Sequence, residues 1–130
     1  FNTGHDGSLS TGHANSPKDM ISRLETMVLM GMDLPLPAIE RQIASGLDII
    51  VHLGRLRDKS RKVLEVTEVL GYWDGQIHLQ TIYRYEEIRK EDENVTENEK
   101  KDQENKVHGE WKKVAELFHR EKLVAAGYYI

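Results

Sequence analysis

Two alternating runs joined by a turn constrain the fold of this chain more than any other feature. Residues 63–70 read VLEVTEVL and residues 77–83 read IHLQTIY, so apolar and polar side chains alternate along both. Such alternation is typical of strands with one buried face. Between the runs, Trp73, Asp74 and Gly75 form a turn signal. The sequence therefore predicts an antiparallel β-hairpin.

Two helices are expected before the hairpin. Ser16 can cap the first, Pro17 suits its first position, and Gly31 is a plausible stop. The second follows two prolines and ends at Gly46. The apolar positions of the first helix recur at helical spacing and indicate core packing: Met20, Ile21, Leu24, Met27 and Val28.

A short apolar run follows the second helix. Residues 47–53 read LDIIVHL, which is too short and too β-branched for a helix. We expect a strand buried on both faces, with His52 as a core or edge histidine rather than a ligand. Helix followed by buried strand indicates an α/β fold.

Composition excludes several classes of protein. The chain has 130 residues, enough for one domain, and no cysteine, which excludes disulfide scaffolds and thiolate metal sites. Residues 86–106 hold nine acidic and five basic side chains and account for the whole net charge of -4, which argues against generic nucleic-acid binding. The apolar runs are too short to cross a bilayer, so we expect no membrane insertion. The chain begins at Phe1 rather than Met, which favours a piece of a longer protein.

The end of the chain has a different character. Residues 86–109 are strongly charged and are expected to form a charged linker or a solvated helix. Residues 110–130 are expected to form a last amphipathic helix that Gly127 could close, with apolar positions at Trp111, Val114, Leu117, Phe118 and Val124.

The opening stretch carries the first candidate site. Residues 7–11 could run as a short strand ending near His13, which lies with His5 and Asp6 among glycines and hydroxyls before the first helix. A metal site would need more converging ligands than these. A phosphate site fits better, because glycines admit an anion and the helix start is positive. From the residues alone, an ordinary connection is still favoured.

A second constellation follows the apolar run. Residues 55–62 read RLRDKSRK, five cations with one carboxylate. They could form a solvated hairpin turn with its tip at residues 58 and 59. They could equally form a phosphate clamp or a contact with an acidic neighbouring subunit. The residues do not decide between these. No phosphate-binding GxxxxGK[ST] loop is present, so the chain should not hydrolyse a nucleotide alone.

Four stretches together resemble a known family: NTGHDGSLSTGHANSP, RLETMVLMGMDLP, AIERQIASGLDIIVHLGRLRDKSRKV and EVTEVLG. They are similar to the C-terminal part of a CpaF-like ATPase, one of the type II and type IV secretion ATPases, which drives Tad pilus assembly. The resemblance runs over residues 2–85, with a weaker similarity at residues 118–127.

The resemblance implies that residues 1–85 are the C-terminal part of a RecA-like P-loop motor domain. Such a motor is a cytoplasmic homohexamer that uses ATP and Mg²⁺ and docks on an inner-membrane platform protein. In that family the P-loop and the catalytic glutamate precede this segment, so we expect the fragment to bind no cofactor alone. A non-catalytic module that binds the platform or a neighbouring subunit is the alternative.

The resemblance also implies roles for individual residues. Residues 7–16 match the family's His box, in which His13 would be catalytic and face the γ-phosphate, while Thr11 and Asn15 would help to bind the nucleotide. Relatives often carry a bulkier residue where this chain has Gly12, which could loosen the placement of His13. The further candidates for phosphate or intersubunit contact are Arg55, Arg57 and Arg61.

Overall fold

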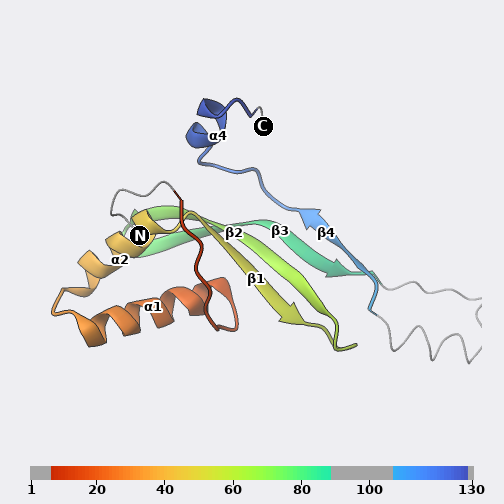
Figure 1. The fold of residues 1–130 in the computed structure, drawn as a ribbon, viewed down its shortest axis with the longest axis horizontal. Helices are drawn as coiled ribbons and strands as arrows, with labels where there is room; N and C mark the ends of the chain where they lie inside the picture. The colour runs from red at the N-terminus through yellow and green to blue at the C-terminus, as the bar shows by residue number, and fades with distance from the viewer. Residues whose placement is uncertain (1–6, 89–106, 129–130) are drawn as a thin grey trace, which may run out of the picture.

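The computed structural model describes residues 7–88 and 107–128. Four antiparallel strands form one sheet in the order β1-β2-β3-β4, and α1 and α2 lie at one end of it (Figure 1). The expected mixed α/β class is confirmed. The elements are α1 (Pro17–Gly31), α2 (Leu36–Gly46), β1 (Ile49–Arg55), β2 (Arg61–Trp73), β3 (Gln76–Glu87), β4 (Gly109–Lys113) and α4 (Glu121–Ala125).

The predicted hairpin is confirmed as β2 and β3, the longest strands of the sheet. Its two turn residues, Asp74 and Gly75, have φ angles of 52° and 72°. Two positive φ angles match the twist of an antiparallel pair, and this explains the Asp-Gly dipeptide. Trp73 and Gln76 face each other where the turn closes.

Both predicted helices are also confirmed. The first begins after Ser16 and ends at Gly31, and the second ends at Gly46. Ile39 of α2 is fully buried, and α2 packs on β2 and β3. Ile21 of α1 is buried too, and α1 packs against α2 and β1. The helices therefore cover part of the sheet and form the core there with Val69 and Ile82.

The prediction that residues 47–53 form a strand buried on both faces is wrong in its burial. β1 is an edge strand with a neighbour on one side only, and exposed and half-buried side chains alternate along it. Val51 and Leu53 are 50% and 64% exposed, whereas Ile50 and His52 are half-buried. Packing of α1 against β1 explains the half-buried face.

The long helix expected over residues 110–130 is also wrong. Its first part is strand β4, and α4 is a five-residue helix. Trp111 donates its indole N–H to the Val63 carbonyl at 2.7 Å and meets the Tyr85 ring edge to face. A side chain at Gly109 would collide with Tyr85, since its Cβ would lie 2.4 Å from that ring. These contacts across the sheet select a strand here.

Two other predicted segments remain. The strand predicted at residues 7–11 does not form, because these residues pair with no strand and run as coil into α1. Of the predicted charged linker, Glu86 and Glu87 end β3, and residues 89–106 lie outside the described residues. No helix in the described ranges combines the length and apolar composition that crossing a bilayer requires.

Candidate functional site

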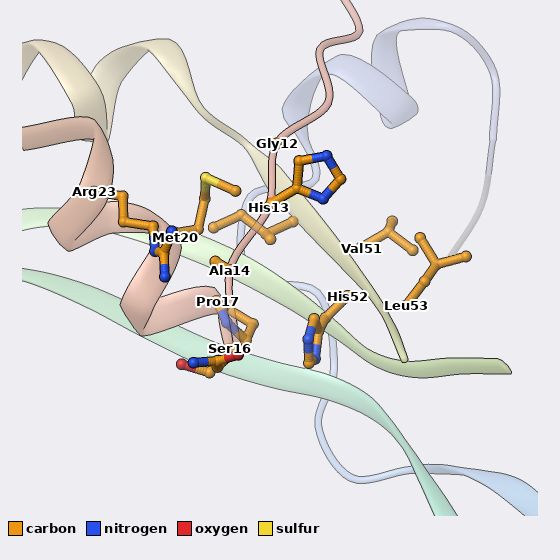
Figure 2. Close-up of a pocket in the computed structure, with 12 residues that line it drawn as sticks. Gly12, His13, Ala14, Ser16, Pro17, Met20, Arg23, Val51, His52 and Leu53 are labelled. Atoms are coloured by element: carbon orange, nitrogen blue, oxygen red, sulfur yellow. The ribbon is translucent and has the colours of Figure 1, made fainter. Parts of the chain in front are cut away.

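A pocket of about 480 Å³ opens between the start of α1, the segment before it and strand β1 (Figure 2). It lies on the part of the chain that carries the His13 motif. Its walls come from three places: residues 12–17, the side chains of Met20 and Arg23 on α1, and residues 50–53 of β1. Two segments more than 30 residues apart in the sequence thus share one cavity.

The α1 end of the pocket is fixed by a hydrogen-bonded cap. Ser16 accepts the Asp19 N–H on its Oγ at 3.0 Å. The Asp19 carboxylate accepts the Asn15 N–H at 3.0 Å and the Arg23 Nε–H at 3.1 Å. The hydrogen bond from the Asn15 backbone, aided by Arg23 and opposed by burial, holds the pKa of Asp19 below its usual value. The backbone before α1 and the Arg23 side chain are therefore held at the pocket wall.

The titratable side chains that line the pocket are all of basic types: His13, His52 and Arg23. His13 is exposed and His52 half-buried, and neither ring hydrogen bonds to any other described residue. Asp19 offsets much of the positive end of α1 and also pairs with the Nε of Arg23, so the donors left for a ligand are the ring N–H groups of His13 and His52 and the terminal nitrogens of Arg23. The pocket suits a ligand with several acceptor oxygens and negative charge.

Gly12 brings the incoming segment directly against α1. A Cβ at this position would lie 2.5 Å from the Cε of Met20, closer than van der Waals contact allows. The absence of a side chain at Gly12 therefore lets Met20 pack beneath the backbone that leads into His13. A larger residue could be admitted only if the flexible end of Met20 moved.

The structure brings together some of the predicted site residues of the opening stretch. His13 and Asn15 line the pocket, whereas Thr11 is exposed and lies just before the lining segment. His5 and Asp6 lie outside the described residues. Within the described part of the chain, no three His, Cys, Asp or Glu side chains gather as metal ligands would.

The three predicted arginines do not line this pocket. They lie on the β1–β2 hairpin, and their contacts differ. Arg57 forms an ion pair with Glu87 of β3, with its Nε 3.2 Å from Oε1. Arg55 and Arg61 are exposed and lie directly opposite each other in the β1–β2 register. Like charges so placed repel each other.

Asp58 and Lys59 form the tip of this hairpin, as one of the two sequence readings predicted. Lys59 has a φ of 67°, and Asp58 accepts the Ser60 N–H at 2.9 Å and the Ser60 hydroxyl. Asp58 also accepts the Val107 N–H at 3.0 Å. These hydrogen bonds, that of the Ser60 hydroxyl first, lower the pKa of Asp58 to about 2. Asp58, the only carboxylate of residues 55–62, is therefore committed to contacts with Ser60 and Val107.

Sequence reasoning missed the role of Glu68. This side chain is 2% exposed, and its two carboxylate oxygens accept the N–H groups of Phe118 and His119 at 2.8 Å each. His119 donates its ring Nε2–H to the Leu70 carbonyl at 2.7 Å. Because these partners lie about 50 residues along the chain, no local signal could have found them.

Sequence reasoning also missed His52 and Arg23 as pocket residues. A local signal existed only for Arg23. Arg23 lies four residues after Asp19, the spacing at which side chains meet on one helix face. His52 lies two residues after Ile50, so the two share one face of the strand. That face could be identified only once the packing of α1 against β1 was known.

Comparisons with known proteins support the type II/IV secretion family to which the sequence is similar. A family model described as "Type II/IV secretion system protein" matches residues 1–117. Two relatives from Mycobacterium tuberculosis, "Putative conjugal transfer protein MT3759" of strain CDC 1551 and "Putative conjugal transfer protein Rv3659c" of strain H37Rv, are each 31% identical over 83 residues. The match covers 64% of this chain and 23% of each relative, so the chain spans about a quarter of their length.

Proposed function

Because the chain belongs to the type II/IV secretion system ATPase family, we propose that it is part of a RecA-like motor that powers pilus assembly or protein secretion. In this proposal the chain is the C-terminal part of a CpaF-like ATPase and supplies one side of the nucleotide site. The other side, with the phosphate-binding loop and the catalytic glutamate, comes from the rest of the motor. The chain alone is inactive.

The observation that carries this proposal is the basic lining of the pocket around His13. An ATP phosphate chain offers the charge and the acceptor oxygens that His13, His52 and Arg23 require. His13 would donate a ring N–H to the γ-phosphate and stabilise the charge that develops there. No carboxylate lines the pocket, so its residues do not fit Mg²⁺, whose ligands would have to come from the rest of the motor.

The remaining roles follow from the same proposal. The motor would be a cytoplasmic homohexamer docked on an inner-membrane platform protein. Thr11 and Asn15 would shape the approach to the nucleotide, Asn15 through the backbone that its N–H fixes. Arg55, Arg57 and Arg61 would lie near phosphate or a neighbouring subunit, and the pairing of Arg57 with Glu87 favours Arg55 and Arg61 for this contact.

The test is His13→Ala in the full-length ATPase. Turnover at saturating ATP should fall by about tenfold to a hundredfold, whereas the dissociation constant for ATP should change much less, because His13 would act on the transferring group. His108→Ala, an exposed histidine outside the pocket, is the matched control. Equal loss of turnover and binding, or no loss of either, would contradict the assignment.

A binding module is the second candidate function, and the C-terminal end of the chain favours it. Phe118 is 69% exposed and Tyr128 is 65% exposed, so two aromatic side chains are accessible to a partner protein. Because β4 completes the sheet, deleting all of residues 111–130 would also damage the fold. Phe118→Ser combined with Tyr128→Ser tests docking more sharply. If capture of the platform protein were unchanged, the recruiting role would fail.

A further inference from the structure

His52 lines the pocket, although the sequence analysis expected a core or edge histidine with no ligand role. It reaches the pocket from β1, whereas His13 reaches it from the segment before α1, and Figure 2 shows both rings in the space between these two walls. We propose that His52 is a second ligand-binding residue of this pocket, which holds a phosphate group of the nucleotide while His13 acts on the γ-phosphate. This inference rests on the nucleotide role proposed above.

The alternation of β1 directs His52 into the pocket. Ile50, His52 and Gly54 are half-buried, whereas Val51 and Leu53, which also line the pocket, are exposed. The helix α1 packs against β1, and Figure 2 shows His52 beside Ser16 and Pro17 at the start of that helix. A strand in a sheet holds its side chains more firmly than a coil segment does. The His52 ring is therefore placed before any ligand arrives.

Two other histidines, His78 and His119, have ring contacts that His52 lacks. His78 stacks on Trp73 at 3.8 Å and lies 3.1 Å from its carbonyl oxygen. His119 donates to the Leu70 carbonyl. The His52 side chain is half-buried like that of His78, yet its ring makes no hydrogen bond within the described residues. No buried side-chain nitrogen or oxygen of the described residues lacks a partner, so the His52 ring nitrogens reach solvent and are accessible to a ligand that enters the pocket.

The chemistry of the pocket identifies the ligand group. His13, His52 and Arg23 offer N–H donors from three different elements, and no acidic side chain lines the cavity. A volume of about 480 Å³ falls within the usual range for small-molecule sites. A chain of phosphates has acceptor oxygens along its length, so donors on opposite walls can contact different phosphates.

The positions of the two histidines predict different duties. His52 lies on a strand and should contribute to binding of the ground state. His13 lies on an exposed coil segment that packs through Gly12 on the flexible Met20 side chain, so it can follow the γ-phosphate as that group is lost. Substitution of His52 should therefore mainly weaken nucleotide binding, whereas substitution of His13 should mainly lower turnover.

The experiment compares His52→Phe and His52→Gln in the full-length ATPase with a non-hydrolysable ATP analogue. Phe keeps the planar ring but has no donor, so the dissociation constant should rise by about tenfold or more, as expected for loss of a hydrogen bond to a charged group. Gln keeps an N–H donor and should restore much of the affinity. Turnover at saturating ATP should change less in both variants than in His13→Ala.

The outcomes separate this inference from the proposed function. If His52→Phe bound the analogue as tightly as the unaltered protein while His13→Ala still lost turnover, His52 would have no binding role and the nucleotide site would stand. If neither variant changed binding or turnover, the proposed function itself would fail. Equal weakening by Phe and Gln would indicate a packing role and overturn the inference. His108→Ala should leave both measurements unchanged.

Discussion

The segment before α1 and the segment from Val107 to the C-terminal end of the described chain are attached to the rest of the fold in opposite ways. The C-terminal segment is tied to the sheet by hydrogen bonds, from Val107 to Asp58, from Trp111 to the Val63 carbonyl, and from residues 118 and 119 to Glu68. Residues 7–14, which carry His13, make no hydrogen bond to any other described residue. Both segments run beside the same sheet, but only the C-terminal one is fixed to it.

This difference indicates what each segment does. The carboxylates that hold the C-terminal segment are charged acceptors for backbone N–H groups, which are among the stronger hydrogen bonds in proteins. That segment therefore belongs to the fold. The His13 segment is positioned only where it meets α1, by the Ser16 cap and the contact between Gly12 and Met20. Few contacts would have to break for it to rearrange around a ligand, which the proposed role of His13 requires.

The largest expected effect on stability is at the C-terminal attachment. Glu68→Ala leaves the N–H groups of Phe118 and His119 without their acceptor and removes a buried side chain. We expect a loss of about 3 kcal/mol in the free energy of unfolding. Urea unfolding followed by circular dichroism measures it. Glu68→Gln keeps one acceptor oxygen and should lose less.

Glu110→Ala is the control for this prediction, since Glu110 is exposed on β4. It should stay within about 0.5 kcal/mol of the unaltered chain. If Glu68→Ala were as stable as Glu110→Ala, the C-terminal segment would be no better held than the His13 segment, and the contrast between them would not hold.

The second prediction concerns the stability of the chain at low pH. The pKa of Asp58 is lowered to about 2, below the value of about 3.9 of an unfolded chain. The stability that Asp58 contributes is therefore fully present above about pH 4 and is lost as the pH falls toward 2. The chain should be more stable than Asp58→Asn at pH 6, and the difference should shrink as the pH approaches 2.

Thermal unfolding at several pH values measures that difference. Asp33→Asn, at an exposed position on the α1–α2 connection, should show no comparable pH-dependent gap. A gap for Asp58→Asn that stayed constant between pH 6 and pH 2 would mean that the hydrogen bonds to Val107 and Ser60 do not depend on the charge.

A smaller effect is expected where the His13 segment meets α1. Ser16→Ala removes the oxygen that accepts the Asp19 N–H and should cost about 1 kcal/mol, as other N-cap substitutions do. Urea unfolding again measures it. Ser22→Ala, on the exposed side of the same helix, should have little effect. A loss no larger than that of Ser22→Ala would show that the cap does not hold this end of the pocket.

The features that sequence predicted correctly are those decided by neighbouring residues. The Asp74-Gly75 turn and the Ser16 cap each depend on a few adjacent positions. The burial of β1 was predicted wrongly, because an apolar run does not reveal whether a strand lies at an edge. The terminal helix was predicted wrongly because Trp111 finds Val63 and Tyr85 across the sheet, and such contacts override a helical spacing.

In the candidate site, too, some residues could be identified from the sequence and one could not. His13 and Asn15 lie in a motif that a family resemblance makes visible, and both line the pocket. His52 stands 39 positions later, in a run that reads as a strand, and nothing in that run distinguishes a pocket histidine from a core one. Only the packing of α1 against β1 brings it beside the motif.

The smallest expected effect is that of His13 itself on stability. Because its ring is exposed and makes no hydrogen bond within the described residues, His13→Ala should change the free energy of unfolding by less than about 0.5 kcal/mol. His119→Ala should cost about 1 kcal/mol or more, since it removes the hydrogen bond to the Leu70 carbonyl. Urea unfolding of the two variants without nucleotide compares the two flanks directly. A loss for His13→Ala equal to that of His119→Ala would show that the His13 segment is part of the packed fold and is not held ready for a ligand.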